Sequence, residues 1–450
     1  MTTPTALQRL GTGLLTPDSP SFAQATAVQF ATDGAGPAAV VQPTTTAEVV
    51  EAVRAAREAQ LPVAVRSGGH SYAAHGVGEG ALAIDVRGLG DVVIDPGRLV
   101  GRAGGGATAG AYTAAAAEYG LATGFGDTPT VGIAGLTLGG GMGFLSRRDG
   151  LTVDNLLSAE VVLANGSVVT ADATQHPELF WALRGGGGNF GVVTELSYRL
   201  RATSLVSGGM LAFAPTPERI AAATAALLGA PDELAGMINL MLAPPAPFLP
   251  ESIHGKPLMM LLVCWSGPES AAEAALAPLR AIGEPVVDAV ATRPYPEMLQ
   301  SPPGAGEAPR AVARTAFTDR VDEEWGARAL AALSTAVTPV AAFNLRPMGG
   351  AIARSTQDTA FAHRHRAVMA SVVAVTPDAT VVPAAEAWVE ETRDSVGLVG
   401  PGYVNFMSSA TPDDVAAAYP GAVLERLGRV KRTYDPDNVF RINHNVLPSR

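Results

Sequence analysis

Residues 66–72 read Arg66-Ser-Gly-Gly-His-Ser-Tyr72, and this segment decides how the first half of the chain is interpreted. It follows Pro62-Val-Ala-Val, an apolar run typical of a short buried strand. Glycine lets backbone N–H groups approach a ligand closely, so Gly68 and Gly69 can wrap an anionic group such as a pyrophosphate. His70 would then lie near the other end of that ligand, where a neutral imidazole can attack an activated cofactor carbon. Taken alone, His70 also fits a loop histidine that only caps a turn.

Further glycine clusters lie at 104–106, 139–143 and 185–188. Together they predict a long anionic cofactor lying across one domain, although each cluster alone also fits an ordinary turn. Gly104-x-Gly106-x-x-Ala109 matches the fingerprint of nicotinamide-dinucleotide folds. That fold needs a buried strand ending in an acidic residue after the helix. Leu121–Gly143 is instead rich in glycine, threonine and proline, which argues against NAD.

The composition narrows the class of protein. With 450 residues, of which 47% are hydrophobic, the chain predicts two domains or one large α/β unit with an insertion. A net charge of −11 argues against nucleic acid and anionic membranes as partners. No signal-peptide pattern and no apolar run long enough to span a membrane is evident, so we expect a cytoplasmic protein. The single cysteine, Cys264, cannot form an internal disulfide and is expected in the core.

Local patterns predict the main elements. Helices are expected at Thr46–Glu58, Ala107–Tyr119, Glu178–Leu183, Pro217–Leu228 and Ser270–Ile282. Strands are expected at Pro62–Arg66, Ala83–Val86, Val92–Ile94, Val192–Leu200, Met259–Trp265 and Val340–Leu345. Asn165-Gly166 predicts a hairpin with a type I′ turn between Ala159–Leu163 and Ser167–Ala171. The proline-rich stretches Pro244–Pro250 and Ser301–Pro309 are expected to be loops.

With these segments in view, the chain resembles the FAD-linked oxidases of the vanillyl-alcohol-oxidase superfamily, in their berberine-bridge-enzyme-like branch. The resemblance covers nearly the whole chain and is strongest at Arg66–Tyr72, Pro129–Phe144, Gly150–Asn155, Leu179–Val193 and Tyr434–Asn445. It implies a two-domain α+β fold of the vanillyl-alcohol-oxidase type. Residues 1–204 and 411–450 would form a discontinuous FAD-binding domain, and residues 205–410 a substrate domain with an antiparallel sheet. A change in composition near Arg201–Ser207 fits this boundary.

The resemblance also implies roles for single residues. FAD would be bonded to His70 through its 8α-methyl carbon, with its pyrophosphate on Ser67, Gly68 and Gly69. The adenine end would lie beside Gly191 and Val193, and the isoalloxazine ring near Asn443 and Asn445. The expected cofactor-binding set is Arg66, Ser67, Gly68, Gly69, His70, Ser71, Thr128, Pro129, Gly132, Gly135, Leu136, Gly140, Gly143, Gly191, Val193, Asn443 and Asn445.

Two positions bear on how the flavin is attached and on its reaction with O2. Many relatives have a second covalent anchor, a cysteine directly before the proline at 129, where this chain has Thr128. We therefore expect attachment through His70 alone, without a cysteinyl link, and a large oligosaccharide becomes a less favoured substrate. Val131 lies where the family has its oxygen-gatekeeper residue, and valine there is compatible with oxidase action. Packing in a strand is the alternative for Val131.

The catalytic side is expected on the sheet of the second domain. Phe343-Asn-Leu-Arg346 has period two, so Asn344 and Arg346 should share one face while the intervening side chains face a core. In an amine-oxidising relative this strand carries ionisable residues. Neither Asn344 nor Arg346 is a base, which disfavours amine oxidation of that kind. A solvated polar face is the alternative.

Tyr403 and Asn405 have the same spacing and should also share a face. Tyr403 could be the catalytic base if Arg346 lowers its pKa. His363 and His365 could form a metal pair on a strand, but no third ligand is evident. We therefore favour a surface or packing role for both histidines and expect no metal site.

The expected reaction is the oxidation of a C–H bond in a small alcohol, amine or polyketide-like secondary metabolite, with hydride passing to flavin and O2 reoxidising it to give H2O2. Expected partners are thus the substrate and O2, with no nucleic acid and no membrane, for a monomer or homodimer. Two alternatives stay open. One is a flavin dehydrogenase with another electron acceptor, and the other is a non-catalytic flavin-binding protein.

Overall fold

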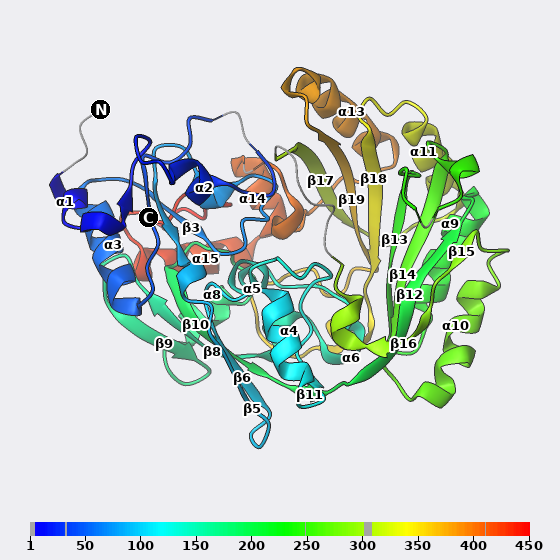
Figure 1. The fold of residues 1–450 in the computed structure, drawn as a ribbon, viewed down its shortest axis with the longest axis horizontal. Coiled ribbons are helices and arrows are strands. Elements are labelled where there is room, and N and C mark those ends of the chain that lie inside the picture. The colour runs from blue at the N-terminus through cyan, green and yellow to red at the C-terminus, as the bar shows by residue number, and fades with distance from the viewer. Residues whose placement is uncertain (1–4, 32–33, 248, 301–307, 410) are drawn as a thin grey trace.

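The structure is a computed structural model that describes residues 5–31, 34–247, 249–300, 308–409 and 411–450. It has two lobes (Figure 1). We call the described residues before 205 and after 410 the terminal lobe, and those between them the central lobe. In Figure 1 the red C-terminal helices lie among blue and cyan elements, so both ends of the chain contribute to one lobe. The division at 204 and 410 remains our working proposal.

The terminal lobe contains two main sheets. The first has the order β1 (Leu14–Leu15), β2 (Ala39–Val41), β4 (Leu82–Asp85), β3 (Val63–Arg66), with parallel pairing of β2 and β3 to β4. The second is antiparallel, with the order β5 (Val92–Asp95), β6 (Val100–Gly104), β10 (Val192–Arg199), β8 (Leu156–Val162), β9 (Val168–Asp172). A small ribbon pairs β7 (Leu121–Ala122) with β11 (Arg201–Ala202). The helices are α1 (Thr5–Gln8), α2 (Phe22–Thr26), α3 (Thr46–Glu58), α4 (Ala109–Ala117), α5 (Ile133–Leu138), α6 (Ser146–Asp149), α7 (Thr152–Asn155), α8 (Pro177–Leu183), α14 (Pro412–Ala418) and α15 (Ala422–Tyr434).

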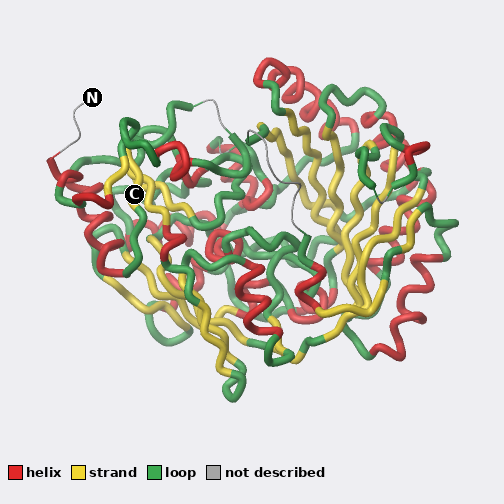
Figure 2. The backbone as a smooth tube through the Cα atoms, in the orientation of Figure 1, coloured by secondary structure: helices red, strands yellow, loops and turns green. Residues whose placement is uncertain are grey.

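The central lobe is built on one antiparallel sheet, as the sequence predicts. Its order is β15 (Val287–Asp288), β12 (Leu205–Phe213), β14 (Pro257–Trp265), β13 (Leu234–Leu242), β18 (Val340–Pro347), β19 (Val368–Thr376), β17 (Arg310–Thr318), with β16 (Ala291–Pro294) paired to β12. One face packs under α9 (Pro217–Leu228), α10 (Ala272–Arg280), α11 (Glu323–Leu333) and α13 (Val382–Ser395). The other face turns toward the terminal lobe (Figure 2), near the short helix α12 (Gly350–Arg354).

The predicted helices and strands all occur, with ends shifted by a few residues. Helix α3 begins at Thr46 because the side chain of Thr45 accepts a hydrogen bond from the Glu48 N–H. Its buried stripe includes Val49 and Val53 at the spacing of one helix face. Pro244–Pro250 contains no helix or strand among its described residues, and most of Ser301–Pro309 lies outside the described ranges.

The hairpin of β8 and β9 is confirmed, but the predicted type I′ turn is wrong. Such a turn needs a positive φ at both central residues, and only Gly166, with φ 77°, has one. Asn165 keeps a negative φ because the chain first makes a turn that the Gly166 N–H closes on the Leu163 carbonyl at 2.8 Å. Gly166 then provides the left-handed residue that returns the chain to β9.

Arg147 of α6 joins the two lobes. Its buried guanidinium donates to the backbone carbonyls of Ala230, Leu234 and Met348, all in the central lobe. No carboxylate is needed to satisfy these donors, because carbonyls at strand and loop ends fill the fork of the guanidinium. The contact fixes how the central sheet lies on the terminal lobe.

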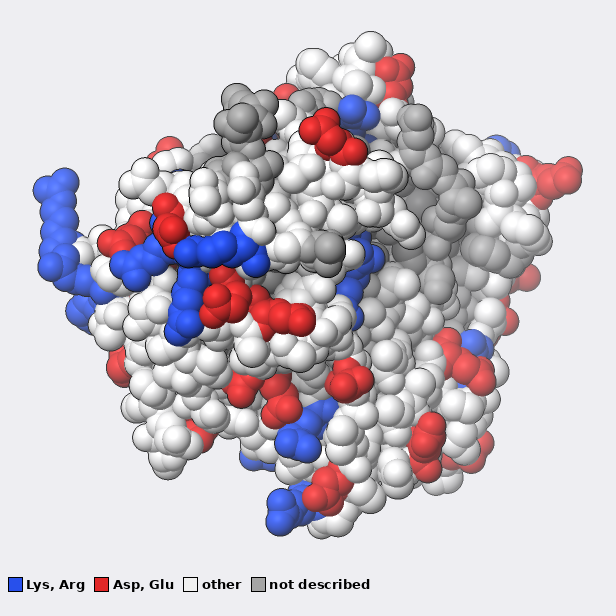
Figure 3. All heavy atoms as spheres, turned by 60° about the vertical axis from the view of Figure 1, so that its left-hand side comes forward, with Lys and Arg blue, Asp and Glu red and all other residues white. Residues whose placement is uncertain are grey.

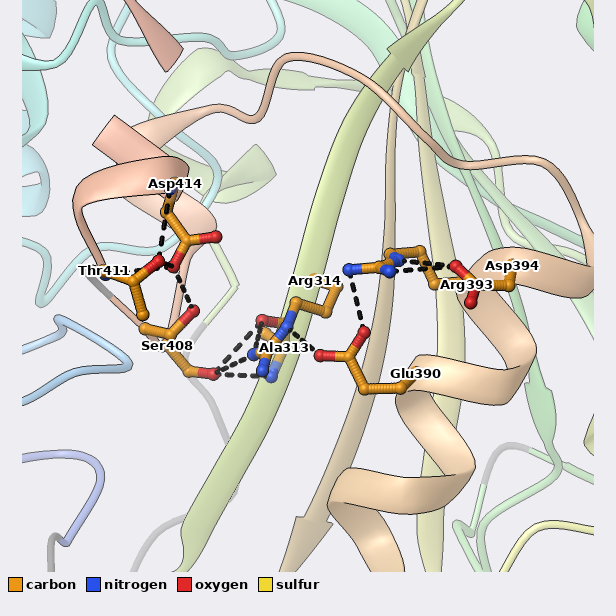
Figure 4. A network of polar contacts seen from close by, with 9 residues as sticks. Ala313, Arg314, Glu390, Arg393, Asp394, Ser408, Thr411 and Asp414 are labelled. Carbon is orange, nitrogen blue, oxygen red and sulfur yellow. Dashed lines mark hydrogen bonds and ion pairs between the residues drawn. The ribbon is translucent and has the colours of Figure 1, made fainter. Parts of the chain in front are cut away.

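A polar network within the central lobe covers the edge strand β17 (Figure 4). Ser408 accepts a hydrogen bond from the Ala313 N–H at 2.9 Å and donates to the Ala313 carbonyl at 3.1 Å. Arg314 beside it donates to Glu390 of α13 at 2.7 Å. An exposed strand edge is a site for unwanted pairing, and Ser408 occupies part of this edge.

Charged side chains of both signs share the surface (Figure 3), and the helices are not of the membrane-spanning kind among the described residues. On the side shown in Figure 3, basic and acidic side chains are interspersed, so no broad patch of one sign forms there. None of the helices in the described ranges combines the length and the apolar character needed to cross a bilayer.

A buried ion pair fastens the C-terminal return. Lys431 and Asp435, one turn apart on α15 and just after it, have fully buried side chains and lie 2.6 Å apart. The Lys431 ammonium also donates to the carbonyls of Asn189 and Phe440. Burial lowers the pKa of Lys431, and the nearby Asp435 carboxylate opposes that effect. The pair therefore ties α15 to the segment that precedes Asn443.

We predict that Lys431→Met destabilises the protein by about 3–5 kcal/mol, because it leaves the buried Asp435 charge without its cation. Urea unfolding followed by tryptophan fluorescence measures the change. Arg328→Met is the matched control, because Arg328 and Glu324 are also four residues apart but are exposed, with a pair distance of 3.2 Å. The control should cost less than about 1 kcal/mol. Equal losses in the two variants would contradict the assigned role of Lys431.

Candidate functional site

The site begins where two loops of the terminal lobe cross. Gly68 follows β3 and Gly132 precedes α5, and their backbones lie so close that a Cβ on either glycine would overlap the other segment. For Gly68 the obstacle is the Gly132 nitrogen, and for Gly132 it is the Ser67 side chain and the Gly68 nitrogen. Only glycine fits at these two positions, since the neighbouring atoms are mostly backbone and cannot move aside.

The crossing leaves hydrogen-bond donors free. Within the described part of the chain, the N–H groups of Gly68, Gly69, His70 and Ser71 donate to no protein acceptor. Those of Gly132, Ala134 and Gly135 are likewise unpaired. Neighbouring N–H groups of this kind form a concave site for anions. Gly135 is exposed, and an added Cβ there would meet nothing within 4 Å, so space lies beside these donors.

His70 and Thr130 extend from the two crossing loops and meet. The His70 Nε2 atom lies 2.9 Å from the Thr130 hydroxyl. Burial lowers the pKa of His70, while Asp127 and the Thr130 backbone oppose that shift. The imidazole is therefore neutral near pH 7, which is the state a nucleophilic histidine needs.

Arg66 supports the loop from behind. Its buried guanidinium donates to the carbonyls of Ala25 and Ala27 and lies 3.9 Å from Asp85. Gly69, with φ 74°, packs against this guanidinium. Arg66 thus holds the loop in place, and its predicted role in binding the cofactor stays a prediction.

The other predicted cofactor residues fall into two groups. Leu136, Gly140 and Gly143 lie in the segment that begins at Thr128 and Pro129, next to the crossing. A Cβ at Gly143 would overlap the Phe125 carbonyl, which again requires glycine. Gly191 and Val193 lie at the start of β10, where Val193 is buried in the core.

The C-terminal return adds two orphaned acceptors. The side-chain oxygens Oδ1 of Asn443 and Asn445 are buried and have no hydrogen-bond partner. Asn443 donates through Nδ2 to the carbonyls of Gly188 and Phe440 at 3.0 and 3.1 Å. A buried oxygen without a partner is costly, so these two atoms point to a ligand that donates hydrogen bonds.

A polar chain crosses from the terminal lobe to the central sheet. Arg346 lies beside Asp127, with 2.5 Å between Nη2 and Oδ2, and also donates through Nε to Asn344 Oδ1 at 2.9 Å. Asn344 Nδ2 donates to Asn239 Oδ1 at 2.7 Å. Burial raises the pKa of Asp127, but Arg346 and Thr128 outweigh that effect and the net pKa is lowered. Asn344 and Arg346 therefore share a face, as predicted, and Arg346 is held by a carboxylate.

Arg346 fixes the direction of the hydrogen bonds in this polar chain. Arg346 can only donate, so Asn344 must present its oxygen to Arg346 and its NH2 group to Asn239. Asn239 then accepts through its oxygen and leaves its own NH2 group unpaired. Asn239 is partly exposed, so the chain ends in a neutral donor on the sheet face that is turned toward the terminal lobe.

The prediction that Tyr403 has a lowered pKa is wrong. Burial raises the pKa of Tyr403 to about 12, although Arg346 and two hydrogen bonds act in the opposite direction. Its hydroxyl accepts hydrogen bonds from the Gly141 N–H and from Asn405 Nδ2, each at 2.9 Å. Asn405 also donates to the Leu136 carbonyl. Tyr403 is therefore a neutral phenol that helps to hold the Gly141 loop.

Tyr403 and Asn405 also do not lie on a strand. Residues Val404–Phe406 form a 3₁₀ turn, and the two side chains meet through their hydrogen bond instead of through strand alternation. His363 and His365 likewise lie outside the strands. His363 is buried and stacks on Phe317 with ring centroids 4.7 Å apart. Among the described residues, no group of three histidine, cysteine or carboxylate side chains could hold a metal ion.

Several residues near the site do not stand out in the sequence. Tyr72 and Phe406 have ring centroids 6.1 Å apart, and the Arg346 guanidinium lies 4.9 Å from the Phe406 ring centre. Burial raises the pKa of Tyr72 to about 12, so it too is a neutral phenol. Tyr72 comes two residues after His70, and this proximity could have marked it. Asp127 and Asn239 gave no comparable signal.

The residues present fit FAD. Its pyrophosphate needs several N–H donors, and the crossing loops provide them. The flavin ring carries N–H and C=O groups that need partners, and Asn443 and Asn445 have unpaired oxygens. The only cysteine, Cys264, is buried on β14, and Thr128 precedes Pro129.

We predict that Gly132→Ala prevents tight binding of FAD, because the added Cβ overlaps Ser67 and the Gly68 nitrogen. The flavin absorbance per purified chain should fall to less than about a tenth of the wild-type value, since displacing the loop removes several donors at once. Gly229→Ala is the matched control, as its added Cβ meets only the Ala225 carbonyl at 3.4 Å. Full flavin content in Gly132→Ala would disprove the role of the crossing.

The buried His444 and the half-buried His75 lie near the C-terminal asparagines. His75 and His444 meet edge to face with ring centroids 4.9 Å apart. Burial lowers the pKa of His75 to about 3, with a further effect of His444. Burial lowers the pKa of His444 to about 4, against opposing effects of the Ser409 carbonyl and Asp414. Both rings are therefore neutral in the folded protein at neutral pH.

We predict that the free energy of unfolding falls as the pH is lowered from about 6.5 to about 4. In this window the unfolded chain binds a proton at each histidine and the folded protein does not, so acid favours unfolding by up to about 1.4 kcal/mol per pH unit for each histidine. Urea titrations at several pH values measure this slope. His444→Asn should flatten it, because it removes one of the two histidines. An unchanged slope in His444→Asn would assign the effect to other groups.

Comparison with known proteins agrees with this geometry. Family models described as "FAD binding domain" and "Berberine and berberine like" match residues 37–172 and 402–447. The chain is 33% identical over 422 residues to (R)-6-hydroxynicotine oxidase of Paenarthrobacter nicotinovorans, covering 89% of both chains. It is 31% identical over 444 residues to an FAD-linked oxidoreductase of Gibberella zeae, covering 92% of this chain and 81% of the relative. The crystal structure of 6-hydroxy-D-nicotine oxidase from Arthrobacter nicotinovorans matches with a TM-score of 0.87 and 27% identity, covering 100% of both chains. The chain therefore belongs to the berberine-bridge-enzyme-like family of FAD-linked oxidases.

Proposed function

We propose that this oxidase carries FAD covalently on His70 alone and oxidises a neutral, hydroxyl-bearing small molecule, such as an alcohol or a polyketide-like metabolite. When bound, FAD accepts a hydride from the substrate carbon and passes the electrons to O2. The chain's own residues must bind and orient the substrate. We infer the substrate class from the polar chain that runs from Asp127 to Asn239.

The two charged groups of this polar chain, Asp127 and Arg346, already form an ion pair with each other. Asp127 is paired with Arg346, so its carboxylate is not free to hold a substrate ammonium group. Asn239 offers an N–H donor, which suits a hydroxyl, ether or carbonyl oxygen and repels a cationic amine. Tyr72 and Tyr403 are neutral phenols at physiological pH and add no negative charge. The site therefore supports a neutral substrate better than the amine left open by the sequence.

The covalent link is supported by the chemistry of position 70. His70 is neutral, partly buried and directly next to unpaired N–H groups that fit a pyrophosphate. Thr128 cannot form a thioether. Cys264 is buried in a hydrophobic cluster that contains side chains of both lobes. Val131 is only partly buried, and its medium size is compatible with O2 reaching the flavin.

We predict that acid-precipitated wild-type protein keeps its flavin in the washed pellet and that His70→Ala releases it into the supernatant. Anaerobic reduction of the flavin by matched pairs, such as benzyl alcohol and benzylamine or cyclohexanol and cyclohexylamine, then tests the substrate class. Alcohols should reduce the flavin faster than the amines of the same skeleton. Asn239→Asp, which adds a negative charge, should shift this ratio toward amines.

Each outcome separates one part of the proposal. Flavin in the wild-type supernatant would overturn the covalent link but not the substrate class. Faster reduction by amines would overturn the substrate class but not the link. Slow reoxidation by O2 with fast reduction would identify a dehydrogenase that uses another acceptor.

A further inference from the structure

The contact between His70 and Thr130 has a consequence for how the flavin becomes attached. Thr130 lies on the loop that crosses the His70 loop, and its hydroxyl is 2.9 Å from His70 Nε2. The backbone carbonyl of Thr130 also acts on the ring, and no hydrogen bond of Nδ1 is found within the described part of the chain. The other ring nitrogen, Nδ1, is therefore free of protein partners.

We propose that Thr130 is a positioning residue for flavin attachment, which holds His70 with its proton on Nε2 so that the lone pair of Nδ1 forms the bond. This inference rests on the proposed function, because it requires His70 to carry the flavin. A neutral imidazole has one protonated and one unprotonated nitrogen, and only the unprotonated one is nucleophilic. A partner that accepts a proton at Nε2 therefore selects Nδ1.

The surroundings of the ring bear on its protonation. The backbone of Thr130 and the carboxylate of Asp127 both favour a proton on the ring, although burial is the larger effect and keeps the imidazole neutral overall. Asp127 in turn is held by Thr128, whose hydroxyl donates to it at 2.9 Å. A ring that becomes partly positive during bond formation is stabilised by that carboxylate.

A bond forms between His70 Nδ1 and the 8α carbon of FAD, and one C–H bond of that methyl group breaks. The Nε2 proton and the methyl proton are released, and two electrons and two protons end on the flavin, which is thereby reduced. Molecular oxygen then takes the two electrons and two protons and becomes H2O2.

A hydroxyl group can form a hydrogen bond with His70 both before and after flavin attachment. Before attachment Thr130 accepts the Nε2–H, and after attachment Nε2 has lost its proton and can accept the Thr130 O–H instead. Valine has the same shape as threonine but can do neither. Serine keeps the hydroxyl and loses only a methyl group, so it is the conservative variant.

The test compares wild-type protein, Thr130→Val and Thr130→Ser, each produced without flavin and then mixed with FAD under air. Covalent incorporation is followed over time by flavin fluorescence of the denatured chain and by intact mass. We expect incorporation to slow about tenfold in Thr130→Val, the factor that corresponds to one hydrogen bond of about 1.4 kcal/mol. Thr130→Ser should stay within about threefold of wild type.

A second measurement separates positioning from a general loss of the cradle. In the His70→Ala background no bond can form, so the dissociation constant of FAD reports the cradle alone. Adding Thr130→Val should change this constant less than about threefold, since the hydroxyl then has no imidazole to hold. A larger loss would assign Thr130 to the cradle and overturn its role toward His70.

The remaining outcomes are also decisive. Wild-type rates in Thr130→Val would overturn the role of Thr130 while leaving the covalent link intact. Absence of covalent flavin in the wild-type protein would overturn the link and, with it, this inference. Slow incorporation in Thr130→Val, with rescue by serine and unchanged FAD binding in the His70→Ala background, supports the proposal.

Discussion

The site depends on one steric constraint, the crossing of two loops at Gly68 and Gly132. Because neither residue has a Cβ, the two backbones approach closely enough to turn their N–H groups to a common space. The same crossing brings His70 and Thr130, which are far apart in the sequence, within hydrogen-bond distance. A larger residue at either glycine would separate the loops, and the anion cradle and the histidine contact would be lost together.

The site also requires that the central sheet lies over this cradle. Two arginines hold the sheet in that place. Arg147 binds carbonyls of the central lobe, and Arg346 reaches back from β18 to Asp127. Arginine suits this role because its planar fork satisfies several acceptors at once and stays charged when buried. Arg346 also orients the amides of Asn344 and Asn239, since a group that can only donate sets the direction of every hydrogen bond after it. A structural contact between the lobes thus also decides which polar group the sheet presents to the terminal lobe.

Much of the fold could be predicted because its signals are local. The Thr45 cap and the apolar stripe of α3, the glycine at 166 and the alternation along β18 depend on neighbours a few residues away. The turn type at Asn165 could not be predicted, because Asn-Gly suits more than one hairpin turn and the register of β8 and β9 chose between them. The pKa of Tyr403 was wrong for a related reason. The sequence shows a nearby arginine but not the burial that outweighs it.

By itself, the sequence determined the family, the class of cofactor, the histidine expected to carry it and the strand face that holds Asn344 and Arg346. These follow from motifs in fixed order and from periodicity, which survive without knowledge of contacts. Only the tertiary structure decided that Arg66 supports the loop, that Arg346 is paired with Asp127 and that Thr130 meets His70. Burial and hydrogen-bond direction depend on segments more than two hundred residues apart, and chain spacing carries no record of which of them meet.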